Sequence, residues 1–298
     1  MISRIKQKIS RAWFNFQCAG IFDTPPVKCD PGSNVVIVSQ LHHPDLTMYM
    51  LAAKSFARFV KPQSFVIVDD GLLPEDKQIL TKHFGTIRFV PRKSVQRGKC
   101  PEGGCWERLL ILSDTNKEHY AIQLDSDTLT LAEPTEVLQS IAHAQTFTLG
   151  TSSGQYFVGF EQASRFAHEN ACEHIQNQAE RALGEYPGRE HLKYVRGCAG
   201  LTGFSVGQLS KEKIEEFSSQ METLLGREKW CKWGTEQVTS NYMAANAPDS
   251  LVLPVDRYPF WVPGEDITRA VLIHFFGSFR FSEGRYLQHA RQIIKQLR

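Results

Sequence analysis

The sequence predicts one α/β domain with a mixed, mainly parallel central sheet that is flanked by helices. Between residues 34 and 90, short apolar runs alternate with stretches of helical periodicity, which is the pattern of parallel β-α-β units. The 298 residues are 42% hydrophobic and 22% charged, an ordinary globular composition with enough chain for one large core. No stretch has the composition of a linker, so a second domain is not expected.

The first half of the chain is expected to be the regular part of this domain. Turn residues 30–33 precede the first strand, Pro62 follows the first helix, and Gly85 follows the second helix. Apolar runs predict strands at residues 34–38, 64–68, 87–90 and 120–124, and helical periodicity predicts helices at residues 46–60, 75–84 and 106–113.

The chain after residue 145 is less regular. We expect strands at residues 146–150, 201–206 and 271–276, and helices at residues 161–183, 211–225 and 285–297. The last of these helices is amphipathic, so we separate residues 285–298 from the domain at 31–284.

Residues 1–30 are expected to form an N-terminal amphipathic extension. An apolar stripe recurs there at helical spacing between lysines and arginines, and it consists of Ile2, Ile5, Ile9, Trp13 and Phe16. We expect this stripe to dock the helix on its own domain. Contact with a membrane surface is the alternative, because either role gives a helix one apolar stripe.

Charge and cysteine content exclude several classes of protein. The net charge of +2 gives no broad positive field, so no nucleic-acid partner is expected. Seven cysteines without a regular spacing favour reduced thiols in a cytosol over disulfides. No apolar run is long enough to span a membrane or to act as a secretory signal. We expect a cytoplasmic protein, with peripheral contact at the inner face of a membrane left open.

An acidic pair, Asp125 and Asp127, directly follows the predicted strand at 120–124. Ligands of open α/β sheets bind beyond the carboxyl ends of the strands. Side chains two residues apart in extended backbone point the same way, so both carboxylates can reach one ion. Mg²⁺ and Mn²⁺ accept such oxygens and keep positions for phosphate oxygens, so the pair predicts a divalent-cation site. A solvated loop is the structural alternative.

A phosphatase would also place an Asp-x-Asp triplet after a strand. Phosphatases of the haloacid-dehalogenase type carry Thr or Val two residues beyond the second Asp, where this chain has Leu129. No later acidic motif completes that arrangement, so a phosphatase is a minor alternative.

Four segments between residues 65 and 280 together resemble the family 8 glycosyltransferases, which have the GT-A fold. The run 65–71 is similar to the family's second strand, and Arg108 with the triplet 125–127 is similar to its arginine and metal-binding Asp-x-Asp. The run 234–241 resembles an Asp-Gln-Asp-x-x-Asn segment with Glu236 at the first acidic place. The run 273–280 resembles a His-x-x-Gly-x-x-Lys signature with Arg280 at the lysine.

The resemblance implies a role for each matching residue. It implies Mn²⁺ or Mg²⁺ held by Asp125, Asp127 and His274. It implies donor contacts from Gly277, which leaves the backbone open to the diphosphate, and from Arg280, which keeps the charge of the family's lysine. We also expect Asp70 and Ser126 on the donor side. The expected catalytic residues, near the reacting sugar, are Arg108, Glu236 and Gln237.

The resemblance also implies a function. We expect transfer of a sugar from a nucleotide-diphosphate donor, a UDP-sugar, to a hydroxyl of a glycan, lipid-linked or protein acceptor, with retention of anomeric configuration. Residues 31–131 would form the nucleotide-binding half and residues 132–284 the acceptor half. Synthesis of a bacterial surface glycan is the setting expected by analogy. The family's acidic residue after the first strand is replaced by the run 39–41, Ser-Gln-Leu, so the base stays open.

Two other classes of protein are compatible with the same candidate residues. A sugar nucleotidyltransferase would carry a glycine-rich phosphate loop near its first strand, and residues 35–45 contain no glycine. A non-catalytic nucleotide- or carbohydrate-binding protein on the same fold is the main alternative. Five aromatic residues of the last third are expected to belong mostly to the core: Trp230, Trp233, Tyr258, Phe260 and Trp261.

Overall fold

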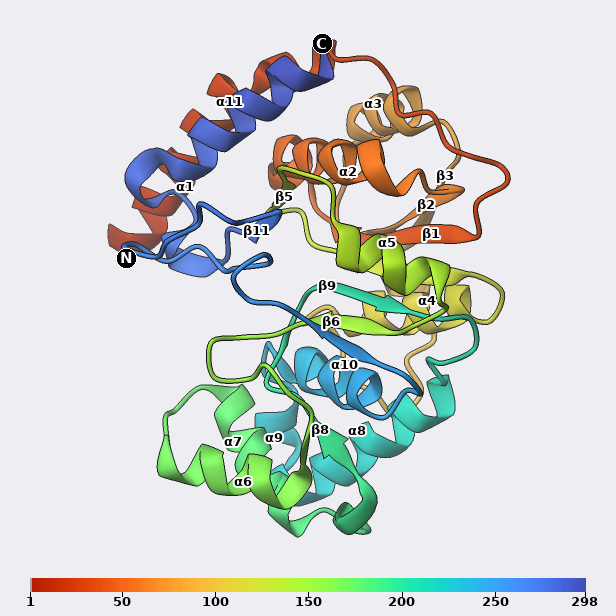
Figure 1. Cartoon of the computed structure of the whole chain (residues 1–298), viewed down its shortest axis with the longest axis vertical. Helices are drawn as coiled ribbons and strands as arrows, with labels where there is room; N and C mark the ends of the chain where they lie inside the picture. Colours follow the sequence, from red (N-terminus) through yellow and green to blue (C-terminus); the bar gives the residue numbers. More distant parts are fainter. Residues whose placement is uncertain (1) are drawn as a thin grey trace.

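Seven strands form the central sheet of the computed structural model, which describes residues 2–298, with side chains from residue 5 onward (Figure 1). The strand order is β10-β6-β9-β4-β1-β2-β3. All neighbouring strands are parallel except β9, which runs antiparallel to both β4 and β6. The strands are β1 (Val35–Leu41), β2 (Ser64–Asp69), β3 (Ile87–Pro91), β4 (Tyr120–Leu124), β6 (Phe147–Leu149), β9 (Cys198–Phe204) and β10 (Leu251–Leu253). The predicted mixed, mainly parallel sheet is therefore confirmed.

Helices cover both faces of this sheet, and the strands bury side chains on each face. Val35 and Ile37 of β1 belong to one core, and Val36 and Val38 belong to the core on the opposite face. Helices α1 (Ile2–Gln17), α2 (Leu46–Val60), α3 (Pro74–Phe84), α5 (Thr135–Ala142) and α11 (Arg285–Leu297) pack on the first face. Helices α4 (Trp106–Asn116), α6 (Phe160–Glu169), α7 (Ile175–Ala182), α8 (Lys211–Leu225), α9 (Arg227–Trp230) and α10 (Thr235–Ala245) pack on the second.

Two small antiparallel pairs and several 3₁₀ turns complete the fold. Strand β5 (Thr128–Thr130) pairs with β11 (Leu272–His274), and β7 (Val158–Gly159) pairs with β8 (Lys193–Tyr194). The 3₁₀ turns are η1 (Ala19–Asp23), η2 (His43–Asp45), η3 (Arg92–Ser94), η4 (Leu183–Glu185), η5 (Arg189–His191), η6 (Gly277–Phe279) and η7 (Ser282–Gly284).

The second half departs from the predicted elements in three places. The helix expected at 161–183 is two helices, α6 and α7, which a non-helical connection separates. The strand expected at 201–206 begins earlier, at Cys198, and the strand expected at 271–276 is shortened to β11. Helices α5, α9 and α10 and strands β5, β7, β8 and β10 were not predicted. These strands have only two or three residues, which is too short to show a periodicity.

The two terminal helices lie side by side next to α2 (Figure 1). Phe14 of α1 stacks on Tyr286 of α11 with ring centroids 4.3 Å apart, and both side chains are buried. The predicted stripe does not make this contact: Ile5, Ile9, Trp13 and Phe16 are between 55% and 74% exposed. Docking through the stripe was therefore a wrong prediction, because the helix docks through its opposite face. The side chain of Ile2 lies outside the described residues.

None of the helices in the described part of the chain combines the length and the apolarity that crossing a bilayer requires. The division into residues 1–30, 31–284 and 285–298 stays a prediction, and Met1 lies outside the described residues.

Candidate active site

The acidic pair lies at the carboxyl end of β4, where the buried strand turns into β5. Asp125 follows the last residue of β4, and its backbone N–H donates to the Gly200 carbonyl of β9 at 2.9 Å. Asp127 precedes β5 directly. Because β5 pairs with β11 so that Thr128 lies opposite His274, the imidazole from a distant part of the chain reaches the acidic turn. Strand pairing, not sequence proximity, assembles these three residues.

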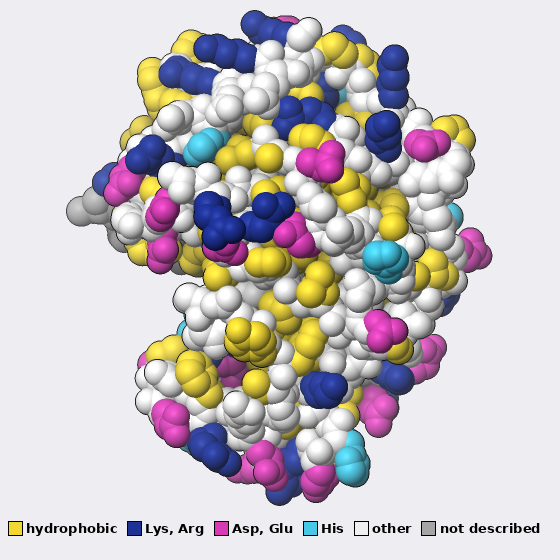
Figure 2. All heavy atoms as spheres, in the orientation of Figure 1, with side chains coloured by type: hydrophobic (Ala, Val, Ile, Leu, Met, Phe, Trp, Pro, Cys, Tyr) yellow, Lys and Arg dark blue, Asp and Glu magenta, His cyan; other side chains and the backbone are white. Residues whose placement is uncertain are grey.

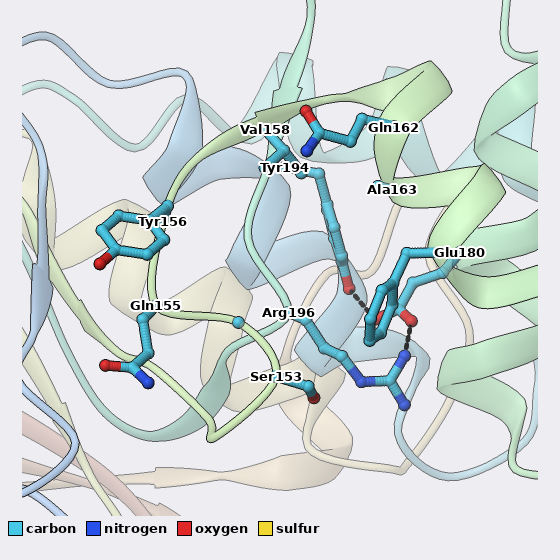
Figure 3. Close-up of a pocket in the computed structure, with 11 residues that line it drawn as sticks. Ser153, Gln155, Tyr156, Val158, Gln162, Ala163, Glu180, Tyr194 and Arg196 are labelled. Atoms are coloured by element: carbon cyan, nitrogen blue, oxygen red, sulfur yellow. Dashed lines mark hydrogen bonds and ion pairs between the residues drawn. The ribbon is translucent and has the colours of Figure 1, made fainter. Parts of the chain in front are cut away.

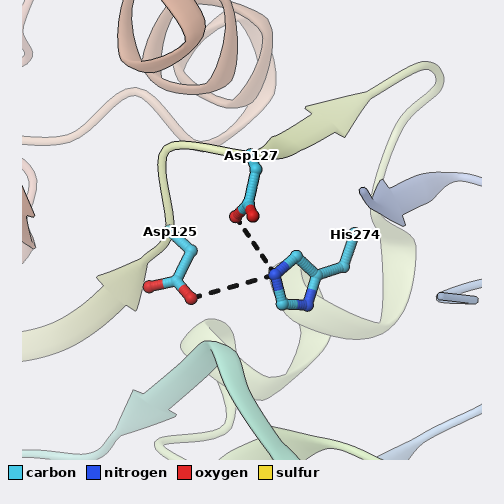
Figure 4. A group of neighbouring side chains, drawn as sticks. All are labelled: Asp125, Asp127 and His274. Atoms are coloured by element: carbon cyan, nitrogen blue, oxygen red, sulfur yellow. Dashed lines mark hydrogen bonds and ion pairs between the residues drawn. The ribbon is translucent and has the colours of Figure 1, made fainter. Parts of the chain in front are cut away.

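Asp125, Asp127 and His274 form a group that could hold a divalent metal ion (Figure 4). One ligand atom from each residue lies within 4.8 Å of the other two. The His274 Nε2 atom is 3.1 Å from Asp127 Oδ1 and 3.8 Å from Asp125 Oδ2. Two carboxylates and one imidazole are ligands that Mn²⁺ accepts, and Mg²⁺ accepts the carboxylates, so the donor set fits either ion.

Buried charges surround this group. Arg280 donates from Nη2 to Asp127 Oδ2 at 2.5 Å and from Nε to the Phe275 carbonyl at 3.0 Å. Burial alone would raise the pKa of Asp127, but His274 and Arg280 hold that pKa below its usual range. Burial would lower the pKa of His274, yet Asp127 and Cys198 raise it well above its usual value. Asp127 and His274 thus each favour the charged form of the other.

A second ionic cluster connects the acidic turn to α10. Arg108 of α4 is buried and forms ion pairs with Asp125 and with Glu236, the latter at 3.2 Å from Nη2 to Oε1. Glu236 belongs to the first turn of α10. Burial raises the pKa of Glu236 to about 7, Arg108 opposes this rise and Asp125 adds to it. Glu236 can therefore hold or release a proton near neutral pH, unlike a solvated surface carboxylate.

Most of the predicted site residues line one cavity of about 520 Å³. We call it the central cavity. The predicted residues in its wall are Arg108, Asp125, Asp127, Glu236, Gln237, His274, Gly277 and Arg280.

Two details of the wall bear on what the central cavity can bind. Gly277 has a φ of 57°, and a Cβ placed there would have no described atom within 4 Å beyond its chain neighbours. The backbone at Gly277 is therefore open. Gln237 accepts from the Ala199 N–H at 3.2 Å and donates to Gln176 Oε1 at 2.8 Å, so its amide is fixed in the wall.

Asp70 and Ser126 are not among the lining residues of the central cavity. Asp70 forms an ion pair with Arg92 at 2.6 Å and accepts from Gln40 Nε2 at 3.1 Å. The Ser126 carbonyl accepts from the Tyr286 hydroxyl at 3.5 Å. Both roles stay predictions.

Several lining residues were not found from the sequence, among them Thr151, Gln176, Cys198 and Phe276. Gly200, which is not among the lining residues, was also missed: a Cβ there would lie 2.5 Å from His274 Nδ1, so only glycine leaves room for the imidazole. A glycine inside an apolar strand often marks such a close approach, which was the available signal.

The aromatic residues of the last third divide between core and cavity. Trp230, Tyr258 and Trp261 are buried, as predicted. Trp233 is 72% exposed and lines the central cavity together with Phe260. The prediction that most of these five residues belong to the core is therefore confirmed, and Trp233 is an exception.

A mainly parallel sheet with one antiparallel strand and an acidic turn after β4 is the fold of the GT-A glycosyltransferases, and solved structures of such enzymes share it. The WbbM bifunctional glycosyltransferase superposes with a TM-score of 0.51 and 13% identity over 88% of this chain and 50% of that one. Galactosyltransferase LgtC, in complex with donor and acceptor sugar analogues, superposes with a TM-score of 0.50 and 10% identity over 86% of this chain and 95% of LgtC. An active-site mutant of LgtC gives a TM-score of 0.50 at 9% identity over 87% and 95%.

This chain thus spans about half the length of WbbM and nearly all of LgtC. No model of a known family matches the sequence, and no curated protein matches it. At these identities the likeness establishes the fold, and membership of family 8 stays a prediction.

Proposed function

We propose that this chain is a metal-dependent glycosyltransferase that moves a sugar from a UDP-sugar to a hydroxyl acceptor. The observation that carries the proposal is the convergence of Asp125, Asp127 and His274 at the end of β4, inside a cavity of donor size. A bound Mn²⁺ or Mg²⁺ would supply positive charge to the leaving diphosphate. The GT-A fold is consistent with this chemistry, although fold alone does not determine function.

The chain's own residues have separate tasks in this proposal. Arg280 would hold diphosphate oxygens with its forked guanidinium, and the open backbone at Gly277 would let them approach. Fixed positive groups at a developing negative charge are an effective way to lower a reaction barrier. Arg108 and Glu236 would face the donor sugar, whose anomeric carbon gains positive character as the diphosphate leaves. Gln237 would contact the acceptor.

The finer parts of the proposal rest on the sequence resemblance. They are retention of anomeric configuration, a glycan, lipid-linked or protein acceptor, and a role in bacterial surface glycan synthesis. The non-catalytic binding protein, the sugar nucleotidyltransferase and the phosphatase remain the alternatives that an assay must separate.

A donor screen tests the proposal directly. Thermal unfolding is measured with several nucleotide sugars, with and without Mn²⁺, followed by release of the nucleoside diphosphate from any donor that binds. A ligand of the native state raises the unfolding midpoint. We expect one donor to do so only with Mn²⁺ and then to be turned over. Asp127→Asn should lose both effects, whereas the surface variant Asp114→Asn should keep them.

Other outcomes of the screen reject the proposal. Metal-dependent donor binding without turnover would favour the non-catalytic protein. Release of inorganic phosphate from simple esters would favour the phosphatase, and formation of a nucleotide sugar from a sugar phosphate and nucleoside triphosphate would favour the nucleotidyltransferase.

We also propose that the terminal helices bind an anionic lipid surface. Ile5, Ile9, Trp13 and Phe16 form an exposed stripe on α1, and Lys6 and Lys8 flank it. Residues 2–17 and 285–298 together hold eight of the 34 Lys and Arg residues and none of the 32 Asp and Glu residues. The rest of the chain therefore has 26 basic against 32 acidic residues and is net negative. Figure 2 shows basic side chains gathered over these helices.

An apolar stripe between cations is the pattern of a helix that lies in a membrane interface. Co-sedimentation with phosphatidylcholine vesicles, with and without phosphatidylglycerol, tests it. We expect binding that needs phosphatidylglycerol and that weakens in high salt. Trp13→Ala should reduce it, and Tyr156→Ala, an exposed aromatic far from α1, should not. Equal binding to both kinds of vesicle, or none, would reject an electrostatic lipid contact.

A further inference from the structure

A second cavity of about 210 Å³ lies beside the central cavity, among the helices of the second half (Figure 3). The loop after β6 forms one side of it and helices α6 and α7 form the other. Its rim carries the rings of Tyr156, which is 78% exposed, and Phe166. Nothing in the proposed transfer of the sugar uses these residues.

The base of the second cavity is polar and rigid. Glu180 of α7 is buried, accepts from the Tyr194 hydroxyl at 3.1 Å and forms an ion pair with Arg196 (Figure 3). Burying an ion pair costs desolvation energy. An ion pair that is kept at the base of a cavity despite this cost is a candidate for ligand binding. Ser153 and Gln162 add further hydrogen-bonding groups to the wall.

The two cavities share a wall, because neighbouring residues of the chain line one cavity and the other. Gly197 lines the central cavity, and its chain neighbour Arg196 lines the second. On α7, Gln176 lines the central cavity, and Glu180, one helical turn later, lines the second. Thr151 of the central cavity donates to the Arg196 carbonyl at 2.7 Å, which ties the loop to this wall.

The shared wall lies on the acceptor side of the central cavity. Gln176 bonds Gln237, the residue assigned to the acceptor, at 2.8 Å. Asp127 and Arg280, which the proposal assigns to the metal and the diphosphate, belong instead to the turn after β4 and to the segment after β11. In the view of Figure 1, β11 lies above β6 and α7 lies below it. A ligand that extends from the acceptor position past Gln176 therefore meets the second cavity.

The lining of the second cavity has the chemistry of a sugar subsite. A sugar ring has an apolar face that packs on an aromatic ring and hydroxyls that bond amides and charged groups. Tyr156 and Phe166 supply the first kind of contact, and Gln162, Glu180 and Arg196 supply the second. The volume is small, so the cavity fits one ring and not a folded segment of protein.

We propose that the second cavity binds a sugar residue of an oligosaccharide acceptor, beyond the residue whose hydroxyl is glycosylated. The proposal rests on the proposed function and adds the acceptor class to it: a glycan of at least two residues. Selection of the acceptor would then depend on Tyr156 and its neighbours, and not on the residues around the acidic turn.

Saturation-transfer NMR with four disaccharides, namely lactose, maltose, cellobiose and diacetylchitobiose, tests this in the presence of UDP and Mn²⁺. We expect at least one disaccharide to bind more tightly than its matching monosaccharide. Tyr156→Ala should weaken that binding about tenfold, the value of one lost aromatic contact. Tyr156→Phe should keep it, because the ring face remains. Trp13→Ala, at another exposed aromatic residue on a distant helix, should also keep it.

The experiment separates failure of this inference from failure of the proposed function. If UDP and Mn²⁺ raise the unfolding midpoint but no disaccharide binds, or if binding survives Tyr156→Ala and Phe166→Ala, the sugar subsite is rejected and the transferase proposal stands. If UDP and Mn²⁺ have no effect on the midpoint, the donor site is rejected instead. Tyr156→Ala is expected to leave the midpoint shift by UDP and Mn²⁺ unchanged in either case.

Discussion

The two ends of the central cavity are built differently. At the end near the acidic turn, every carboxylate has a cationic partner: Arg108 for Asp125, and His274 and Arg280 for Asp127. At the end near α7, Thr151, Gln176 and Gln237 bond through neutral groups, and the exposed ring of Trp233 lies in the wall. Buried ion pairs suit a charged diphosphate, and amides with aromatic faces suit a neutral sugar. We infer that the cavity separates donor and acceptor by charge.

The largest effect is expected at the charged end, from Arg280→Ala. Loss of the guanidinium removes the partner of Asp127 and a contact to the diphosphate, so turnover should fall by about 10³. Arg280→Lys keeps the charge without the forked geometry and should recover part of the loss. Release of nucleoside diphosphate at saturating donor measures both variants. Equal activity of Arg280→Ala and the wild type would contradict the assignment of this end to the donor.

A smaller loss is expected from Gly200→Ala. The new Cβ would lie 2.5 Å from His274 Nδ1, so the imidazole must shift from its present position beside Asp127. Displacing a proposed metal ligand should raise the Mn²⁺ concentration for half-maximal activity by about 10–100-fold. A Mn²⁺ titration of turnover measures this, and Gly159→Ala, where a Cβ meets no described atom within 4 Å, is the matched control. An unchanged titration would show that His274 does not hold the ion.

A still smaller effect is expected at the neutral end, from Gln176→Ala. One hydrogen bond to Gln237 is lost, which corresponds to about fivefold weaker acceptor use. The midpoint shift with UDP and Mn²⁺ should not change. A loss of donor binding in this variant would contradict the assignment of the donor and the acceptor to different ends of the central cavity.

Glu236 lies between the two ends of the central cavity. Its carboxyl should make the free energy of unfolding depend on pH. Its pKa is raised from 4.5 to about 7 by burial, with Arg108 opposing. The unfolded chain thus ionises this group at lower pH than the folded chain does, so its contribution destabilises the fold as pH rises from about 4.5 to about 7. Glu236→Gln removes this dependence. Between pH 5 and pH 8 the midpoint of the wild type should fall relative to the variant by about 2–4 °C or more. Parallel curves in metal-free buffer would contradict the raised pKa.

The sequence predicted the regular half of the molecule better than the irregular half. Helix 46–60 and strand 120–124 have the predicted bounds, because apolar runs and turn residues define them locally. The antiparallel direction of β9 and the pairing of β5 with β11 depend on partners far away in the chain, which no local pattern encodes. The shared wall beside Gln176 was missed for the same reason.

Asp125 and Asp127 were visible because they follow an apolar run, whereas Arg108, Glu236 and Gln237 were identified only through the resemblance to a family motif. The exposed stripe on α1 shows the limit of such patterns. Periodicity identified an apolar face correctly, yet the burial of Phe14 on the opposite side determined how the helix packs. An amphipathic pattern shows that one face is apolar and does not show what covers it.

The position of β9 between β4 and β6 has a consequence for how the chain is made. During synthesis, β1 to β4 can pair as soon as residue 124 is available, but the free edge of β4 has to wait for residues 198–204. An unpaired edge strand with apolar faces is a template for aggregation. The nascent protein therefore passes through a stage of more than seventy residues in which its sheet is open. A chain that stops before β9 is expected to aggregate, and one that includes β9 closes the edge of β4 itself.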